Sequence, residues 1–252
     1  KEIKSRIANL DPLAALEELY RIRDLQEEQE TNVDKLIAEY KKKAAEFEDE
    51  LTRFKSMCTY ENRAYQKGYK YIAGIDEAGR GPLAGPVVAA AVILPENIFI
   101  KNLKDSKKLS SKQRDILYDE IKSKALAFGI GLSDEKCIDK MNILNATKNA
   151  MEQAINSLEI KPDIIFIDAI KLDRILLPQV SIIDGDNLSI SIAAASIIAK
   201  VTRDRLIEEY DRIYPEYGFA KHKGYGTKEH IEAIKKYGIC PIHRLSFVKK
   251  FI

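Results

Sequence analysis

Along the first 66 residues, apolar side chains recur at spacings of three, four and seven, which is the repeat of amphipathic helices. Asp11 followed by Pro12 predicts the start of a first helix, and Thr31 or Asn32 predicts the cap of a second. We therefore expect an antiparallel helical hairpin. Its predicted apolar stripe consists of Leu13, Leu16, Tyr20 and Leu25 in one helix and Val33, Leu36, Ile37, Tyr40, Ala44, Phe47, Leu51 and Phe54 in the other.

From Tyr69 onward the pattern changes to short apolar runs. Residues 71–75 and 87–94 predict two neighbouring buried strands, and strands then alternate with helices. This order predicts an α/β fold, a mixed sheet flanked by helices. The other predicted elements are a helix capped by Ser110 and running to about Ala127, strands 128–132, 163–167 and 180–183, and helices 142–158, 189–210 and 227–237.

Composition changes at the same place. No glycine precedes Gly68, and residues 1–66 have 12 Lys+Arg against 15 Asp+Glu, whereas the remainder has 29 against 24. We therefore expect a helical extension over 1–66 and a main domain over 67–252, and we expect a chain beginning near Lys67 to stay folded. The net charge of the whole chain is +2, which excludes a strongly basic protein that coats nucleic acid but allows an enzyme with local basic patches.

Several classes of protein are disfavoured. No apolar run approaches the roughly 20 residues that span a bilayer, so no membrane association is expected. Three widely spaced cysteines, Cys58, Cys137 and Cys240, argue against a disulfide scaffold or a zinc site and predict a reducing, cytoplasmic setting. We expect a monomer. The hairpin either packs within the protein or binds nucleic acid or a protein partner, and residues 41–43 are its only basic cluster.

Acidic residues lie at the ends of predicted strands. Asp76 and Glu77 close the first strand, Asp168 closes the strand at 163–167, and Asp186 precedes the long helix. Any one of them could be a turn or helix cap. Carboxylates at the ends of buried strands are costly unless they are neutralised, and together they favour a hard divalent cation, Mg²⁺ or Mn²⁺.

One segment narrows the interpretation. Residues 74–88, Gly-Ile-Asp-Glu-Ala-Gly-Arg-Gly-Pro-Leu-Ala-Gly-Pro-Val-Val, closely resemble the opening signature of ribonuclease HII, the type 2 ribonuclease H. Four further matches follow in family order over about residues 69–248. They are the segment from Asp105 to Leu109, the strand ending at Asp168, the run from Gly185 to Asp204, and the segment from His222 to Thr227 with Pro241 to Arg244 after it. The related ribonuclease HIII usually has Gly-Thr-Gly where this chain has Gly79-Arg80-Gly81, so type HII is favoured.

The resemblance implies a ribonuclease H-like fold and an endonuclease that cuts the RNA strand of RNA–DNA hybrids. It also implies incision on the 5′ side of single ribonucleotides embedded in duplex DNA. Asp76, Glu77, Asp168 and Asp186 match the family's catalytic, metal-binding acids, which would hold two Mg²⁺ or Mn²⁺ ions. Asp184 is the rival for the fourth place, and the family pattern selects Asp186.

The substrate must be recognised through its 2′-hydroxyl, which distinguishes RNA from DNA. In the family, the backbone of Gly79-Arg80-Gly81 and the tyrosine matching Tyr225 contact the ribonucleotide. A tight turn is the simpler explanation of the glycines, which also allow a close backbone approach. Arg80 and Lys107 are candidate phosphate contacts, with solvated surface positions as the alternative.

Other polar residues have less definite interpretations. Lys223 is either solvated or a phosphate contact, and Asp204 is expected to pair with an arginine. His222, His230 and His243 are expected to cap elements or contact phosphate rather than bind metal.

Two other classes of function remain open. A non-catalytic nucleic-acid binder would not need the four acids. A metal-dependent phosphatase would need no group that recognises a 2′-hydroxyl.

Overall fold

The computed structural model describes residues 2–25 and 30–252. The chain forms two compact units, Lys1–Ser56 and Met57–Ile252. The division falls earlier than the boundary expected after residue 66. The reason is that helix α4 (Thr59–Gln66) packs as part of the second unit, where Ala64 joins a cluster of apolar strand residues.

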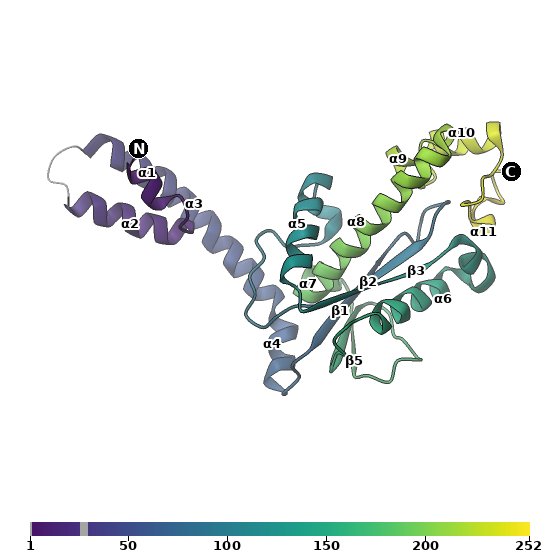
Figure 1. Cartoon of the computed structure of the whole chain (residues 1–252), viewed down its shortest axis with the longest axis horizontal. Helices are drawn as coiled ribbons and strands as arrows, with labels where there is room; N and C mark the ends of the chain where they lie inside the picture. Colours follow the sequence, from purple (N-terminus) through teal and green to yellow (C-terminus); the bar gives the residue numbers. More distant parts are fainter. Residues whose placement is uncertain (1, 26–29) are drawn as a thin grey trace. The chain divides into compact units, whose positions relative to one another are not determined.

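The first unit has an apolar core of its own. Helices α1 (Glu2–Ile7) and α2 (Pro12–Leu25) lie alongside α3 (Glu30–Met57) (Figure 1). Asp11 caps α2 as predicted, because its carboxylate accepts hydrogen bonds from two backbone N–H groups of the first turn, each at 3.0 Å. The buried positions are Ile7, Ala15, Leu19, Ile22, Val33 and Ile37.

Two details of the predicted hairpin were wrong. The buried stripe of α2 runs through Ala15, Leu19 and Ile22, so it is rotated from the expected one, and Leu25 is 82% exposed. Helix α3 already includes residues 31 and 32, so neither Thr31 nor Asn32 is its cap. Small Ala15 carries little weight in a hydrophobic pattern, yet it is fully buried in this core.

The second unit is built on one mixed sheet, which confirms the predicted fold class. Its strands run in the order β3-β2-β1-β4-β5. Strand β2 pairs antiparallel with β1 and β3, whereas β4 pairs parallel with β1 and β5. The strands are β1 (Ile72–Ala78), β2 (Val87–Ile93), β3 (Ala127–Ser133), β4 (Ile164–Asp168) and β5 (Gln179–Ile182).

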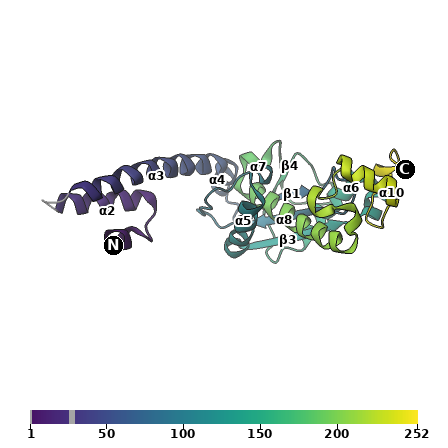
Figure 2. The same cartoon turned by 90° about the horizontal axis from the view of Figure 1, so that it is seen from above.

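Helices α6 and α8 cover opposite faces of the sheet (Figures 1 and 2). Gly74 of β1 allows the backbone of α8 to approach, since a Cβ there would lie 2.0 Å from the carbonyl carbon of Ser191. On the other face, Gly131 of β3 does the same for α6, where a Cβ would lie 2.0 Å from the carbonyl oxygen of Ala150. The helices of this unit after α4 are α5 (Ser111–Lys124), α6 (Glu135–Asn156), α7 (Gly185–Leu188), α8 (Ile190–Ile213), α9 (Phe219–His222), α10 (Lys228–Tyr237) and α11 (Leu245–Val248), with the short helices η1 (Ser106–Lys108) and η2 (Pro215–Tyr217).

The local start signals predicted from the sequence hold for three of these helices. Ser110 forms a capping box with Gln113 at α5, and the side chains of Ser189 and Thr227 cap α8 and α10. Helix α6 starts earlier than expected. Asp134 caps it, and Asn142, with a φ of 68°, kinks the helix and caps its second half by accepting from the N–H of Asn145. Within the described ranges, no helix is long and apolar enough to cross a bilayer.

Candidate active site

The first two acids lie at the end of β1. Asp76 is 5% exposed and faces the side of the sheet covered by α8, together with Gly74. Glu77 is the next residue, and its N–H donates to the Asp76 carboxylate at 2.8 Å. Because β1 is the central strand and is paired on both sides, the position of this end of the strand is firmly set.

The other two acids come from the adjacent parallel strand and the turn after β5. Asp168 ends β4, and one of its carboxylate oxygens accepts from the N–H of Gly185 at 2.9 Å. Asp186 follows in α7 and is only 3% exposed. Its rival Asp184 is exposed, has a left-handed φ of 60°, and accepts from the side chain of Asn187. The structure therefore places Asp186, not Asp184, on the buried side of the turn.

Each of the other three acids affects the pKa of Asp76. Burial raises the pKa of Asp76 well above its ordinary value, and the carboxylates of the other three acids raise it further. Burial also raises the pKa of Glu77, against the opposing effect of Arg80. The pKa of Asp186 rises to about 6, first through burial and then through Asp105.

Two cations already lie against these acids. Arg80 contacts Glu77 at 3.2 Å and Lys107 contacts Asp186 at 3.4 Å, so both predicted phosphate contacts are at the site. Searched over residues 2–25 and 30–252, no three acidic, His or Cys side chains stand ready-formed as a metal site. The donor set nevertheless fits a hard cation. All the donors are carboxylate oxygens, and Oε2 of Glu77 is buried with no hydrogen-bond partner among the described protein atoms.

Sequence reasoning missed a fifth acid. Asp105 is 6% exposed and caps η1 by accepting from the N–H of Lys107 at 2.9 Å. Its charge is the second-largest cause, after burial, of the raised pKa of Asp186. The segment Asp105–Leu109 belongs to the family motifs, but the sequence predicts a site role only for its Lys107. An acid next to two lysines is usually a surface residue, so no local signal revealed its burial.

Sequence reasoning also missed two buried arginines that hold the loop between β1 and β2. Arg244 is 0% exposed and donates to the carbonyl oxygens of Gly79, Arg80 and Gly85 at 2.6, 2.9 and 2.8 Å. Arg203 is 1% exposed and donates to the carbonyl oxygens of Ala84, Pro86 and Lys223, at 3.0 to 3.1 Å. The backbone of the Gly79-Arg80-Gly81 segment is therefore held in place by a buried side chain, that of Arg244.

Tyr225 stands against this loop. A Cβ on Gly81 would lie 3.5 Å from Cε1 of Tyr225, and the tyrosine is 47% exposed. The N–H of Leu83 donates to the carbonyl of Gly224 at 2.8 Å, which joins the two segments. Gly79 has a φ of 99°, a conformation that favours glycine. The structure thus brings Gly81 and Tyr225 together, only a few residues along the chain from Glu77.

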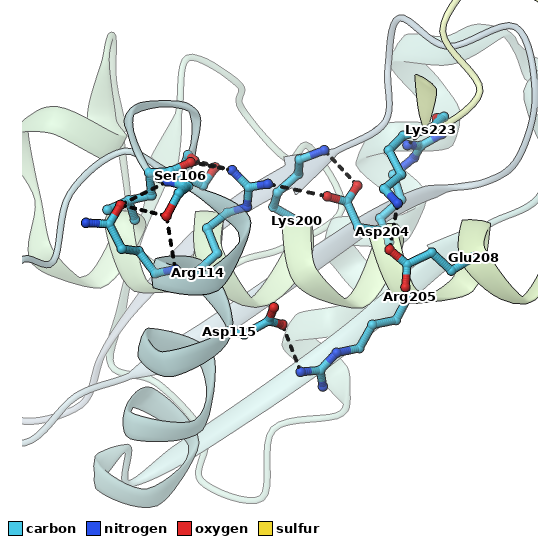
Figure 3. A network of polar contacts seen from close by, with 12 residues as sticks. Ser106, Arg114, Asp115, Lys200, Asp204, Arg205, Glu208 and Lys223 are labelled. Carbon is cyan, nitrogen blue, oxygen red and sulfur yellow. Dashed lines mark hydrogen bonds and ion pairs between the residues drawn. The ribbon is translucent and has the colours of Figure 1, made fainter. Parts of the chain in front are cut away.

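A polar network fixes α5 against α8 beside the site (Figure 3). Asp204 contacts Lys200 at 2.7 Å and Arg114 at 3.8 Å. Asp204 thus has an arginine partner, Arg114, as expected, but its closer partner is Lys200. Lys223 contacts Glu208 at 2.6 Å, which favours the surface interpretation for this lysine.

This mixed sheet, in the order β3-β2-β1-β4-β5 with acids at the ends of the adjacent strands β1 and β4, has the architecture of the ribonuclease H-like class of fold. A family model described as Ribonuclease HII matches residues 73–250. The chain is 62% identical to a ribonuclease HII of Acetivibrio thermocellus, over 100% of this chain and 97% of that protein. A ribonuclease HII of Clostridioides difficile is 50% identical, over 100% of this chain and 98% of the relative. The crystal structure of the ribonuclease H2 from Pyrococcus horikoshii OT3 is 31% identical, with a TM-score of 0.60 over 72% of this chain and 96% of that one.

The chain belongs to the ribonuclease HII family. It is a ribonuclease H, an enzyme that cleaves the RNA strand of RNA–DNA hybrids. The family suggested by the sequence motifs is confirmed.

Proposed function

We propose that this enzyme also incises duplex DNA on the 5′ side of a single embedded ribonucleotide. Asp76, Glu77, Asp168 and Asp186 would be the catalytic, metal-binding residues. The observation that carries the proposal is the proximity of two groups. The four acids interact as one cluster, and the next turn of the chain holds Gly81 against the exposed ring of Tyr225.

The acid cluster would hold two divalent ions, Mg²⁺ or Mn²⁺. Buried carboxylates with raised pKa values are those that gain most from a bound cation, because it neutralises the charge whose burial is costly. Two ions held there would lower the pKa of the attacking water and stabilise the leaving 3′ oxygen.

The cations beside the acids have a second role in this proposal. Arg80 is exposed, and the side chain of Lys107 is 77% exposed although its Nζ contacts buried Asp186. Both side chains can turn from the acids to the phosphates of a bound duplex, where they would position the strand. Released carboxylate oxygens are then available for cations.

Tyr225 and Gly79-Arg80-Gly81 would recognise the sugar. Arg244 holds the carbonyl groups of Gly79 and Arg80 on the inner side of the loop, so the other side of the loop remains for the substrate. A 2′-hydroxyl that meets these groups places one phosphate over the acids. A deoxyribose leaves them without a partner, which costs roughly 1–3 kcal/mol before any effect on alignment.

Cleavage of labelled duplexes, mapped to the nucleotide, tests this function. We expect a single cut 5′ of the ribonucleotide, leaving a DNA 3′-hydroxyl, and essentially no cut in the matched all-DNA duplex. Asp76→Asn and Asp168→Asn should abolish the cut while duplex binding and folding persist. Comparable cleavage of both duplexes, or full activity in chelator, would refute the proposal.

The proposal also covers a protein partner of the first unit and the oligomeric state of the enzyme. The first unit has its own core and would serve as a surface for a protein partner. The enzyme itself would act as a monomer. Pull-down with residues 1–56, compared with the second unit alone, tests the first statement, and sedimentation tests the second.

A further inference from the structure

A continuous chain of buried hydrogen bonds leads from Cys240 to the backbone of Tyr225. The N–H of Cys240 donates to Nδ1 of His243 at 2.9 Å, and Nε2 of His243 lies 3.0 Å from Nε2 of His230. Nδ1 of His230 lies 2.9 Å from the carbonyl oxygen of Tyr225. His230 is 0% exposed and His243 3% exposed, so neither is placed to contact a phosphate, and each side chain instead meets a backbone group.

The tautomer of each imidazole follows from the end of the chain that it touches. Nδ1 of His243 lies 2.9 Å from the backbone N of Cys240, and farther from Sγ and the carbonyl oxygen of the same residue, at 3.1 and 3.3 Å. A backbone N–H can only donate, so this closest contact favours an accepting Nδ1 and a proton on Nε2. A carbonyl oxygen can only accept, so Nδ1 of His230 carries the proton and Nε2 of His230 accepts. The carbonyl of Tyr225 sets the direction of the bond between the rings, from Nε2 of His243 to Nε2 of His230, and the N–H of Cys240 is consistent with that direction.

Protonation of His230 would break this arrangement, because two N–H groups would then face each other across 3.0 Å. Protonation of His243 would place an N–H at Nδ1, 2.9 Å from the backbone N of Cys240. Burial lowers the pKa of His243, and it lowers the pKa of His230 to about 4. Burial therefore favours the neutral form of both rings.

The rings are also held in place by their neighbours. His222 stacks on His230 with centroids 4.5 Å apart, and Phe219 packs edge-on at 5.3 Å. Tyr217 packs edge-on against His243 at 5.0 Å. This packing leaves the imidazole pair little freedom to turn.

The backbone of Tyr225 is fixed on both sides. Its N–H donates to the carbonyl of His222 at 2.9 Å, and its carbonyl accepts from the N–H of Thr227 at 2.8 Å as well as from His230. The tyrosine ring is the exposed part of an otherwise buried arrangement. Of these three contacts, only the one with His230 is made by a side chain, so it is the one that a substitution can remove.

We propose that His230 and His243 act together as positioning residues that set Tyr225 against the sugar at the cut site, and so contribute to the choice of ribose over deoxyribose. Neither histidine touches the substrate. This inference rests on the proposed role of Tyr225. It assigns to the buried pair His230 and His243 the task of positioning that side chain.

The first test measures the tautomers in the unaltered protein. Imidazole ¹⁵N chemical shifts at neutral pH should show His230 protonated at Nδ1 and His243 protonated at Nε2. The same tautomer on both rings, or a doubly protonated ring, would overturn the proposal. This measurement needs no variant and no activity.

The second test separates positioning from packing. His230→Leu removes the donor to Tyr225, whereas His230→Asn keeps an N–H near the position of Nδ1. Since misplacement by about 1 Å can cost about a hundredfold in rate, we expect kcat on the single-ribonucleotide duplex to fall about 10- to 100-fold in His230→Leu. KM should change little, and His230→Asn should recover much of the loss. Equal kcat values for the native and Leu enzymes, or equal losses in Leu and Asn, would contradict the role.

A double-mutant cycle shows whether the effect passes through Tyr225. In a Tyr225→Ala background, His230→Leu should have little further effect, because the ring that it positions is gone. Additive losses would overturn the positioning role and leave the proposed function standing. If the native enzyme instead cut ribonucleotide and all-DNA duplexes alike, the proposed function itself would fail.

Discussion

Asp186 lies in α7 with 3% of its surface exposed, among other acids and one lysine. Burial and the neighbouring carboxylates make its ionised form unfavourable, which lowers the free energy of unfolding when that form is present. The folded protein raises its pKa from 3.8 to about 6, so it binds this proton more tightly than the unfolded chain does. The stabilisation is present below about pH 4 and is lost as the pH rises towards 6. At neutral pH the cost approaches about 3 kcal/mol in the absence of a cation.

Asp186→Asn should therefore stabilise the metal-free protein at pH 8 and have a smaller effect at pH 4.5. Urea unfolding in chelator at both pH values measures the difference. Asp184→Asn is the matched control, because Asp184 is exposed and lies two residues away. An effect of Asp186→Asn that is equal at both pH values would show that its charge is not the source of the cost.

Arg244 makes three hydrogen bonds to the backbone of the loop between β1 and β2, and a lysine at this position has no rigid fork with which to replace them. Arg244→Lys should lower the free energy of unfolding by about 3 kcal/mol, since buried carbonyl groups lose their partners. It should also lower kcat on hybrids. Arg205→Lys, whose arginine is about half exposed and pairs with Asp115, should change neither. An Arg244→Lys enzyme with native stability would mean that the loop holds itself in place.

Sequence alone predicted the strand-end acids Asp76, Glu77 and Asp168 because an acid directly after an apolar run is visible as a pattern. It did not predict Asp105, Arg203 or Arg244. These three residues are buried only because segments distant in the sequence close over them, and a charged residue is by default expected at the surface. The tautomers of the histidine pair depend on distances that no spacing in the sequence encodes.

Among the elements, the sheet and most of the flanking helices were predictable because strand runs and cap residues are local signals. Helix α4 continues the helical composition of the extension, so the sequence pattern does not separate the two. Its Glu61 is 1% exposed and accepts from the hydroxyl of Ser189 and the N–H of Ser191, at 2.5 and 3.1 Å, at the start of α8. Ala64 packs in a cluster with Ile72 and Phe166. This helix is therefore part of the catalytic unit.

A chain that begins at Met57 should fold and cut hybrids, whereas a chain that begins at Lys67 should be strongly destabilised. The shorter chain loses Glu61, and the start of α8, next to Asp186, then has two donors without their partner. Circular dichroism melting and hybrid cleavage compare the two chains. Glu61→Gln in the full chain isolates the carboxylate and should cause a smaller loss. If the chain starting at Lys67 matched the one starting at Met57, the boundary originally expected from the sequence would be correct.

At the scale of the whole molecule, charge is divided unevenly along the chain. Residues 1–56 have 11 Lys+Arg against 14 Asp+Glu, whereas residues 200–252 have 12 against 7. The only basic cluster of the first unit is largely engaged within it. Lys43 contacts Glu39 at 2.6 Å, Lys42 lies 4.0 Å from Glu46, and Lys41 lies 5.8 Å from the centre of the Tyr20 ring. We therefore expect most of the attraction to a phosphate backbone to come from the second unit.

Removal of residues 1–56 should therefore leave the salt dependence of duplex binding unchanged. Affinity for nucleic acid falls with salt in proportion to the number of phosphates neutralised, with a slope of about 0.9 per contact on duplex DNA. Binding of a non-cleavable all-DNA duplex, measured across several salt concentrations, should give equal slopes for the full chain and for residues 57–252. Lys107→Gln provides the comparison, because loss of one proposed phosphate contact should make the slope shallower by about that amount. A shallower slope for residues 57–252 would show that the first unit itself grips the duplex, through lysines that leave their acidic neighbours when DNA is present.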